Sequence, residues 1–147
     1  MKDGKIYSED DLDKTWNDRF GKYASDHGYA YWSWKPYLIK QAMDKMQYGE
    51  TLCYFDGGCV LPSDNAGLDG LGRKIIDAMN TIGKDGYDIG LTRSGQIPCG
   101  YITRQEIVDK MGLTGNREFL YEFPHWQATL MILVKTERTE KLVNDWI

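Results

Sequence analysis

The sequence has few of the residues that build metal clusters or disulfide frameworks. It contains three cysteines, Cys53, Cys59 and Cys99, with no C-x-x-C pair, and two histidines, His27 and His125. Structural zinc sites use four Cys or His ligands at regular spacing, so such a site is disfavoured. The odd number of cysteines argues against a disulfide framework and favours a reducing compartment. We therefore expect a cytoplasmic protein.

Long apolar runs and clusters of positive charge are missing as well. No stretch approaches eighteen apolar residues, and the N-terminus MKDGKIYSEDDLDK is too polar and acidic for a signal peptide. The net charge is -4, the pI is about 5.2, and Lys and Arg are scattered along the chain. These features predict no membrane span and no nucleic-acid binding through a basic face.

Aromatic residues are abundant, at 13% of the chain, with five Trp and ten Tyr. Many of them flank Gly and polar residues rather than lying in apolar runs. Such rings can stack on sugars or nucleobases, and Tyr and Trp also carry a hydrogen-bonding group. Ordinary packing in the core or on the surface is the alternative for most of them.

The apolar pattern predicts helices that alternate with short strands. The predicted helices cover about residues 10–23, 36–48, 65–82, 103–111 and 139–146, and the predicted strands cover 51–55, 87–92 and 128–134. Residues 113–126 are expected to form a long connection, and the aromatic residues 29–34 a loop or an irregular strand. Pro36 is expected in the first turn of its helix. Thr103-Arg-Gln-Glu106 matches a capping box that would open the helix at 103–111, and Thr139 can cap the last helix. Because the strands are short continuous apolar runs, we expect them to be buried on both faces. The prediction is a single α/β domain over residues 1–147, a sandwich with a mostly parallel or mixed central sheet.

Residues 28–59 are the most distinctive stretch, reading GYAYWSWKPYLIKQAMDKMQYGETLCYFDGGC. This stretch resembles a bacterial and viral family of nucleotide-sugar glycosyltransferases with the GT-A fold, many associated with capsular or surface polysaccharide synthesis. The resemblance is carried by Tyr29, Tyr31, Trp32, Trp34, Lys35, Pro36 and Tyr37, and then by Gly49, Tyr54, Asp56, Gly58 and Cys59. Weaker similarity begins at Tyr101 and at Trp126. The likeness as a whole spans about residues 6–147.

The resemblance implies a GT-A-like (Rossmann-like) sandwich, a nucleotide-diphosphate sugar as donor and a saccharide as acceptor. It also implies a strand before this chain and further sequence after it, so the domain is expected to be incomplete at both ends. Asp56 follows the predicted strand 51–55 and would hold Mn²⁺ or Mg²⁺ under the diphosphate, because these cations prefer oxygen ligands. The commoner signature of such enzymes is Asp-x-Asp, whereas at this position the chain has only the one carboxylate of Asp56. The alternative role for Asp56 is to cap a turn.

Further candidate substrate-binding residues lie in the same stretch and beyond it. Gly57 and Gly58 would let the backbone approach a phosphate or sugar, although a tight turn explains them equally well. Lys35 could neutralise a phosphate or could be a surface lysine that lies over an aromatic ring. The other candidates are Tyr31, Trp32, Trp34, Arg93 and Gln127, with hydrophobic packing as the alternative for Trp34 and a solvated side chain as that for Arg93.

No catalytic base can be chosen from the sequence, and His125 is as readily a structural histidine. A retaining mechanism would not require such a base. The leading prediction is a metal-assisted glycosyltransferase. The rival is a non-catalytic relative, a binding or assembly module within a homo-oligomer or a larger complex.

Overall fold

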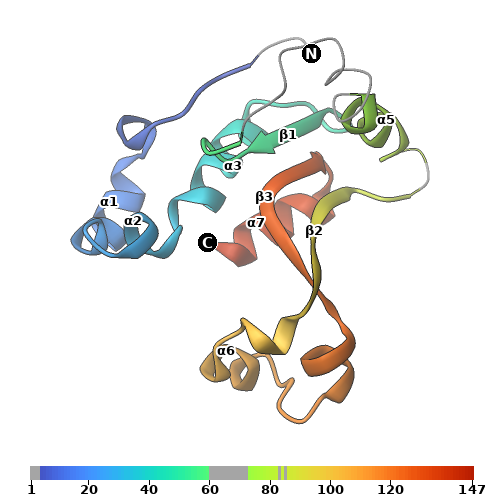
Figure 1. Cartoon of the computed structure of the whole chain (residues 1–147). Helices are drawn as coiled ribbons and strands as arrows, with labels where there is room; N and C mark the ends of the chain where they lie inside the picture. Colours follow the sequence, from blue (N-terminus) through green and yellow to red (C-terminus); the bar gives the residue numbers. More distant parts are fainter. Residues whose placement is uncertain (1–3, 60–72, 83, 85) are drawn as a thin grey trace.

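The structure is a computed structural model that describes residues 4–59, 73–82, 84 and 86–147. The longer elements are α1 (Lys14–Phe20), α2 (His27–Tyr31), α3 (Trp34–Asp44), β1 (Thr51–Phe55), α5 (Arg73–Thr81), β2 (Ile89–Pro98), α6 (Gln105–Lys110), β3 (Pro124–Val134) and α7 (Glu137–Trp146). Short turns of other helix types are η1 (Glu9–Asp11), η2 (Gly21–Tyr23), η4 (Cys99–Tyr101) and η5 (Glu118–Glu122). Figure 1 shows these elements in sequence colours.

The sheet of the described residues has three strands in the order β1-β3-β2, and both pairings are antiparallel. The expected GT-A-like sandwich with a mostly parallel or mixed sheet is therefore wrong. β1 and β2 do run in the same direction, but β3 lies between them and runs opposite to both. The apolar pattern of a strand does not encode its direction. Here the chain reverses after β2 through η4, α6 and η5, and β3 then returns along the sheet.

Helix α3 lies between two hydrophobic clusters and connects them. On one side Tyr37 and Leu38 pack with Leu12, Trp16 and Ala30 from the N-terminal helices. On the other side α3 contributes to a cluster with the sheet and α7, which consists of Ile39, Met43, Met131, Leu133 and Val143. Pro36 lies in the first turn, as predicted, where its missing N–H leaves no hydrogen bond unmade. A helix is confirmed here and is buried on more than one face, but it runs from Trp34 to Asp44 and so ends before the predicted end near residue 48.

A buried lysine closes the other end of α3. Lys135 follows β3, is 7% exposed, and donates from Nζ to the backbone oxygens of Met43 (2.8 Å) and Met46 (2.9 Å). Its ammonium also lies 3.3 Å from Oε1 of Glu140, and the Tyr48 hydroxyl donates to Oε2 of the same carboxylate. A cation at a helix C-terminus satisfies the last carbonyls and opposes their partial negative charge.

The aromatic segment before α3 is a left-handed turn rather than a loop or an irregular strand. Five consecutive residues have positive φ, from Gly28 (65°) to Trp32 (58°), and the turn closes through a hydrogen bond from Trp32 N to Gly28 O (2.9 Å). Left-handed backbone costs about 1–2 kcal/mol for each residue with a Cβ. A Cβ on Gly28 would come within 2.5 Å of the Trp32 ring, so glycine is required there.

Residues 99–123 form a lobe that projects from the sheet, at the bottom of Figure 1. The predicted long connection is only partly correct, because η5 forms within it and β3 begins earlier than expected, at Pro124. The capping box predicted at Thr103 is wrong, since the Thr103 hydroxyl donates to Cys99 O (2.7 Å) and the N-cap of α6 is Arg104. The predicted Thr139 cap is also wrong, because the N-cap of α7 is Thr136.

The remaining predicted elements agree in part. The first helix is interrupted, and α1 is flanked by η1 and η2. β1 has the predicted bounds but lies at an edge of the sheet and is half-buried. The predicted start of the helix at 65–82 lies outside the described residues. Within the described part of the chain, none of the helices has the length and apolar composition needed to cross a membrane.

Candidate functional site

Asp56 and Lys35 form an ion pair at the end of β1, although 21 residues separate them in the sequence. Lys35 Nζ donates to Asp56 Oδ2 across 2.8 Å, and the two side chains are 11% and 24% exposed. Lys35 reaches this point from the first turn of α3. The Asp56 backbone N–H continues the ladder by donating to Thr129 O of β3 (2.9 Å). The structure therefore brings together the two candidate residues from the two halves of the motif.

Tyr54 contributes a third group, which sequence reasoning did not include among the site residues. Its hydroxyl donates to Asp56 Oδ1 across 2.5 Å. Side chains two residues apart on a strand share a face, so the spacing Tyr54-x-Asp56 could have indicated this contact. Burial, and then the hydrogen bond to Asp56, raises the pKa of the Tyr54 phenol well above its usual value. Tyr54 consequently remains a neutral donor at physiological pH.

Gly57 and Gly58 continue from Asp56 into an exposed turn, which closes through a hydrogen bond from Cys59 N to Asp56 O (2.9 Å). Neither glycine has positive φ, and a Cβ added to either one would have no neighbour within 4 Å among the described residues. Within that part of the chain, no contact requires glycine at these two positions. Their backbone is accessible to a ligand at close range, as glycine permits.

The three candidate aromatic residues differ in their surroundings. Trp34 is half-buried against the N-terminal cluster and donates from Nε1 to Gly28 O (3.2 Å), which fits the packing alternative. Trp32 is 45% exposed, with its ring edge-to-face against His27. Tyr31 is exposed and lies under the guanidinium of Arg104, 5.8 Å from the ring centroid.

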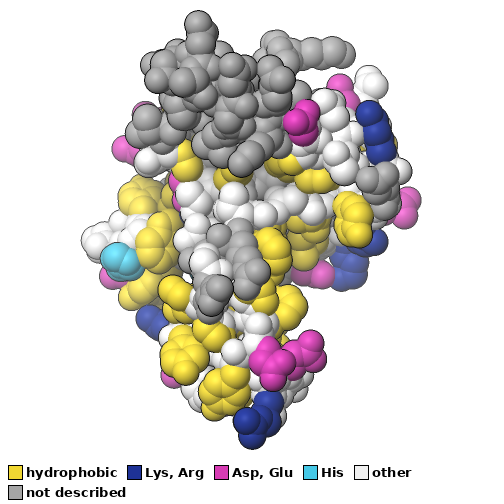
Figure 2. All heavy atoms as spheres, turned by 45° about the vertical axis from the view of Figure 1, so that its right-hand side comes forward, with side chains coloured by type: hydrophobic (Ala, Val, Ile, Leu, Met, Phe, Trp, Pro, Cys, Tyr) yellow, Lys and Arg dark blue, Asp and Glu magenta, His cyan; other side chains and the backbone are white. Residues whose placement is uncertain are grey.

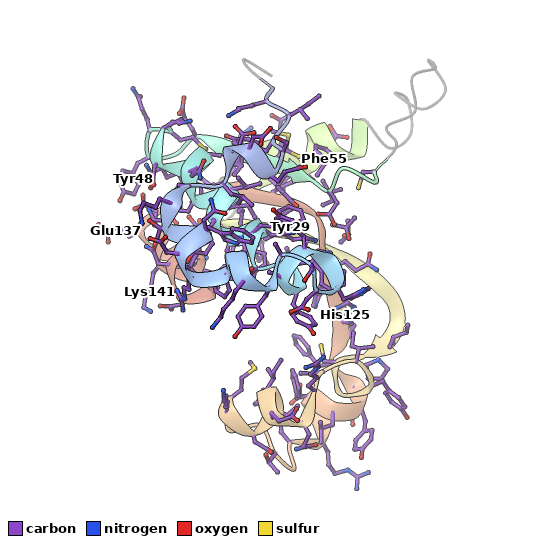
Figure 3. All side chains as sticks on the ribbon, turned by 90° about the vertical axis from the view of Figure 1, so that its left-hand side faces the viewer. Tyr29, Tyr48, Phe55, His125, Glu137 and Lys141 are labelled. Atoms are coloured by element: carbon purple, nitrogen blue, oxygen red, sulfur yellow. The ribbon has the colours of Figure 1, made fainter. Side chains whose placement is uncertain are left out.

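The candidates Arg93 and Gln127 lie on neighbouring strands rather than in the loops that the sequence suggested. The Arg93 backbone pairs with Trp126 and the Thr92 backbone pairs with Gln127, inside β2 and β3. The placement of the Arg93 side chain lies outside what the structure describes, and Gln127 is exposed. His125 is half-buried near the start of β3, where this strand leaves the lobe (Figure 3).

The fit of a divalent cation depends on Asp56. No group of three or more Cys, His, Asp or Glu side chains could hold a metal ion within residues 4–59, 73–82, 84 and 86–147. A carboxylate has about four lone-pair positions, and Lys35 and Tyr54 occupy one on each oxygen of Asp56. The remaining positions suffice for one bond to a cation whose other ligands are phosphate oxygens and water, an arrangement common for Mg²⁺.

A second feature lies in the lobe, where Ile97, Pro98, Tyr101 and Tyr121 line an exposed hollow. Hydrophobic side chains gather on this part of the surface in Figure 2. η4 and η5 meet closely here, because a Cβ on Gly100 would come within 2.4 Å of Leu120 O. The hollow cannot be identified from the sequence alone, since its residues come from segments that are 20 positions apart.

Comparisons with protein-family models, with curated protein sequences and with solved structures found no match to this chain. The glycosyltransferase resemblance therefore rests on the motif residues alone.

Proposed function

We propose that the chain binds a nucleotide-diphosphate sugar at the end of β1 and transfers the sugar to a saccharide acceptor. The observation that carries this proposal is the Lys35–Asp56 pair at 2.8 Å, followed by two exposed glycines that no contact with the described residues requires. The motif resemblance supplies the ligand class. The ion pair supports it, because both residues belong to the motif and come from separate elements.

In the proposed reaction, an acceptor hydroxyl oxygen forms a bond to the anomeric carbon of the donor. The bond between that carbon and the phosphate oxygen breaks, and the nucleoside diphosphate leaves with the bonding electrons. The hydroxyl proton passes to a base or to solvent. Negative charge develops on the leaving diphosphate, so positive charge or fixed hydrogen-bond donors there favour the reaction.

The residues at the end of β1 have distinct proposed roles. Asp56 gives one oxygen to Mn²⁺ or Mg²⁺, and the bound cation supplies charge stabilisation of the diphosphate. The backbone at Gly57 and Gly58 lies against the diphosphate or the sugar. Lys35 keeps the local charge balanced through its pair with Asp56.

Exposed aromatic rings supply surfaces for stacking on a base or a sugar. Trp32 and Tyr31, 45% and 57% exposed, are proposed for this role, whereas Trp34 holds the left-handed turn against the core. Arg93 and Gln127 remain candidate polar contacts on β2 and β3.

The test is calorimetric titration with a panel of uridine-, guanosine- and thymidine-diphosphate sugars in the presence of Mn²⁺. The chain is expected to bind at least one of them, and Asp56→Asn is expected to weaken that binding by about tenfold or more. An assay for the released nucleoside diphosphate with oligosaccharide acceptors then tests transfer. Absence of binding to the whole panel would count against the proposal.

A second candidate function is a non-catalytic binding or assembly module. It is favoured by the fact that both oxygens of Asp56 already have partners. This candidate predicts binding without release of nucleoside diphosphate, or a stable oligomer by light scattering. The three free thiols support a cytoplasmic location for either candidate.

A further inference from the structure

We propose that Tyr54 and Lys35 are positioning residues that fix the Asp56 carboxylate in one orientation, so that its unoccupied lone pairs face the donor ligand. This inference rests on the proposed function and assigns Lys35 to Asp56 rather than to a phosphate. It also adds Tyr54 to the site.

The geometry holds each carboxylate oxygen separately. Tyr54 donates to Oδ1 (2.5 Å) and Lys35 donates to Oδ2 (2.8 Å), so rotation of the carboxylate would break both hydrogen bonds. Bonds to an ionised acceptor are roughly twice as strong as neutral ones. The backbone of Asp56 is held as well, through its N–H to Thr129 O (2.9 Å).

The Lys35 side chain is less accessible to solvent than the carboxylate that it holds. Lys35 is 11% exposed, whereas Asp56 is 24% exposed and continues into the exposed turn at Gly57 and Gly58. A ligand that arrives from solvent therefore reaches Asp56 more readily than the lysine. This difference is the reason for assigning to Lys35 a role that acts through Asp56.

The charge balance has a consequence for metal binding. The ammonium of Lys35 already compensates the single carboxylate, so a free divalent cation gains little by binding there. A cation that arrives with a diphosphate brings its own phosphate ligands. Mn²⁺ alone is therefore expected to bind much more weakly than Mn²⁺ together with a nucleoside diphosphate.

The chain offers a matched control at the other end of α3. Tyr48 donates to Glu140, which pairs with Lys135, so a second lysine–carboxylate–tyrosine group exists, with Glu in place of Asp. Tyr48 precedes β1 and Phe55, the residue before Asp56, ends it, and Figure 3 shows the two residues apart from each other. Tyr48→Phe therefore removes the same kind of hydroxyl without touching the proposed site.

The experiment measures the Kd of the best-binding nucleotide-diphosphate sugar, with Mn²⁺, for the unmodified chain, Tyr54→Phe, Tyr48→Phe, Lys35→Met and Lys35→Arg. Tyr54→Phe and Lys35→Met are expected to weaken binding by roughly 10-fold or more, the range typical of groups that orient a ligand-binding side chain. Tyr48→Phe is expected to change Kd by less than about twofold, and Lys35→Arg to restore most of the affinity lost in Lys35→Met, since a guanidinium also pairs with a carboxylate.

Thermal unfolding of each variant separates positioning from general destabilisation. Both Tyr54→Phe and Tyr48→Phe remove a tyrosine–carboxylate hydrogen bond of 2.5 Å, which is part-buried at Tyr54 and exposed at Tyr48. If the unmodified chain binds and Tyr54→Phe binds equally well, the positioning role is wrong while the proposed function stands. Equal losses of donor affinity in Tyr54→Phe and Tyr48→Phe would also overturn the positioning role. If the unmodified chain binds no member of the panel, both proposals fail. If Tyr54→Phe does not fold, the donor affinities of Lys35→Met and Lys35→Arg decide whether the carboxylate of Asp56 must be held in place.

Discussion

Lys35 Nζ lies 2.8 Å from Asp56 Oδ2, and this contact joins the start of α3 to the end of β1. The pair is only partly exposed, so each charge depends on the other for compensation. It also links the Trp-Lys-Pro part of the motif to the Asp-Gly-Gly part. The stability of the pair and its availability to a ligand can be measured separately.

The first prediction concerns the strength of this pair. Asp56→Asn leaves Lys35 without its counter-ion and is expected to lower the free energy of unfolding by about 1–3 kcal/mol, between the values for exposed and buried pairs. Urea denaturation of Asp56→Asn, Lys35→Met and the double variant measures the coupling. A cycle in which the two effects simply add would contradict the interaction.

The second prediction concerns the C-terminal end of α3. Lys135→Met leaves the carbonyls of Met43 and Met46 without their donor, and it should destabilise the chain by about 1–3 kcal/mol in urea denaturation. Lys141 is the control, because it is 74% exposed and pairs with Asp145 on the surface of α7. Lys141→Met is expected to cost about 0.5 kcal/mol or less. Similar losses in the two variants would show that Lys135 does not cap the helix.

The third prediction separates folding from binding at the glycine pair. Gly57→Ala and Gly58→Ala meet no atoms of the described residues and should change stability by less than about 1 kcal/mol, while they weaken binding of the donor with Mn²⁺ by about tenfold. Gly49→Ala is the control with the opposite pattern. Its φ of 87° makes a side chain unfavourable, so it should lower stability by about 1 kcal/mol and leave Kd unchanged. Unchanged affinity in both alanine variants of the pair would remove Gly57 and Gly58 from the site.

The fourth prediction concerns the thiol of Cys53 on β1. Burial raises the pKa of this thiol from 9.0 to about 11. A raised pKa means that the folded state favours the protonated thiol, so this contribution to stability is present below about pH 9 and is lost as the pH rises toward 11. The pH profile of alkylation at Cys53, followed by mass spectrometry, should have its midpoint near pH 11 in the folded chain and near 9 in urea. A midpoint near 9 in both states would contradict burial of the thiol.

Local sequence patterns were sufficient to predict the elements around the site. Helix α3 follows from apolar spacing and Pro36, and β1 follows from the run Thr51–Phe55. The contact between Lys35 and Asp56 could not be predicted, because local patterns do not determine which residues 21 positions apart meet; the resemblance only places both in one motif. The Tyr54-x-Asp56 spacing is the signal in the sequence that could identify Tyr54, because a strand places both side chains on one face.

The sheet direction and the left-handed turn could not be predicted from the same patterns. β3 is inserted between β1 and β2 by the reversal through residues 99–123, and this arrangement depends on long-range packing rather than on the apolar pattern of any strand. The turn at residues 28–32 contains four residues other than glycine with positive φ, which local preference disfavours. Tertiary contacts stabilise it, including the stacking of Tyr29 on Trp16 at 5.4 Å between ring centroids.

The most direct test of the central claim is calorimetric titration of the unmodified chain and Asp56→Asn with nucleotide-diphosphate sugars and Mn²⁺. The account predicts that one donor binds the unmodified chain with a Kd of about 1 μM to 1 mM, the range usual for enzyme substrates. It also predicts that Asp56→Asn weakens the binding of this donor by about tenfold or more. Equal affinity of the two proteins for that donor, or no binding of any donor to the unmodified chain, would contradict a donor site at Asp56.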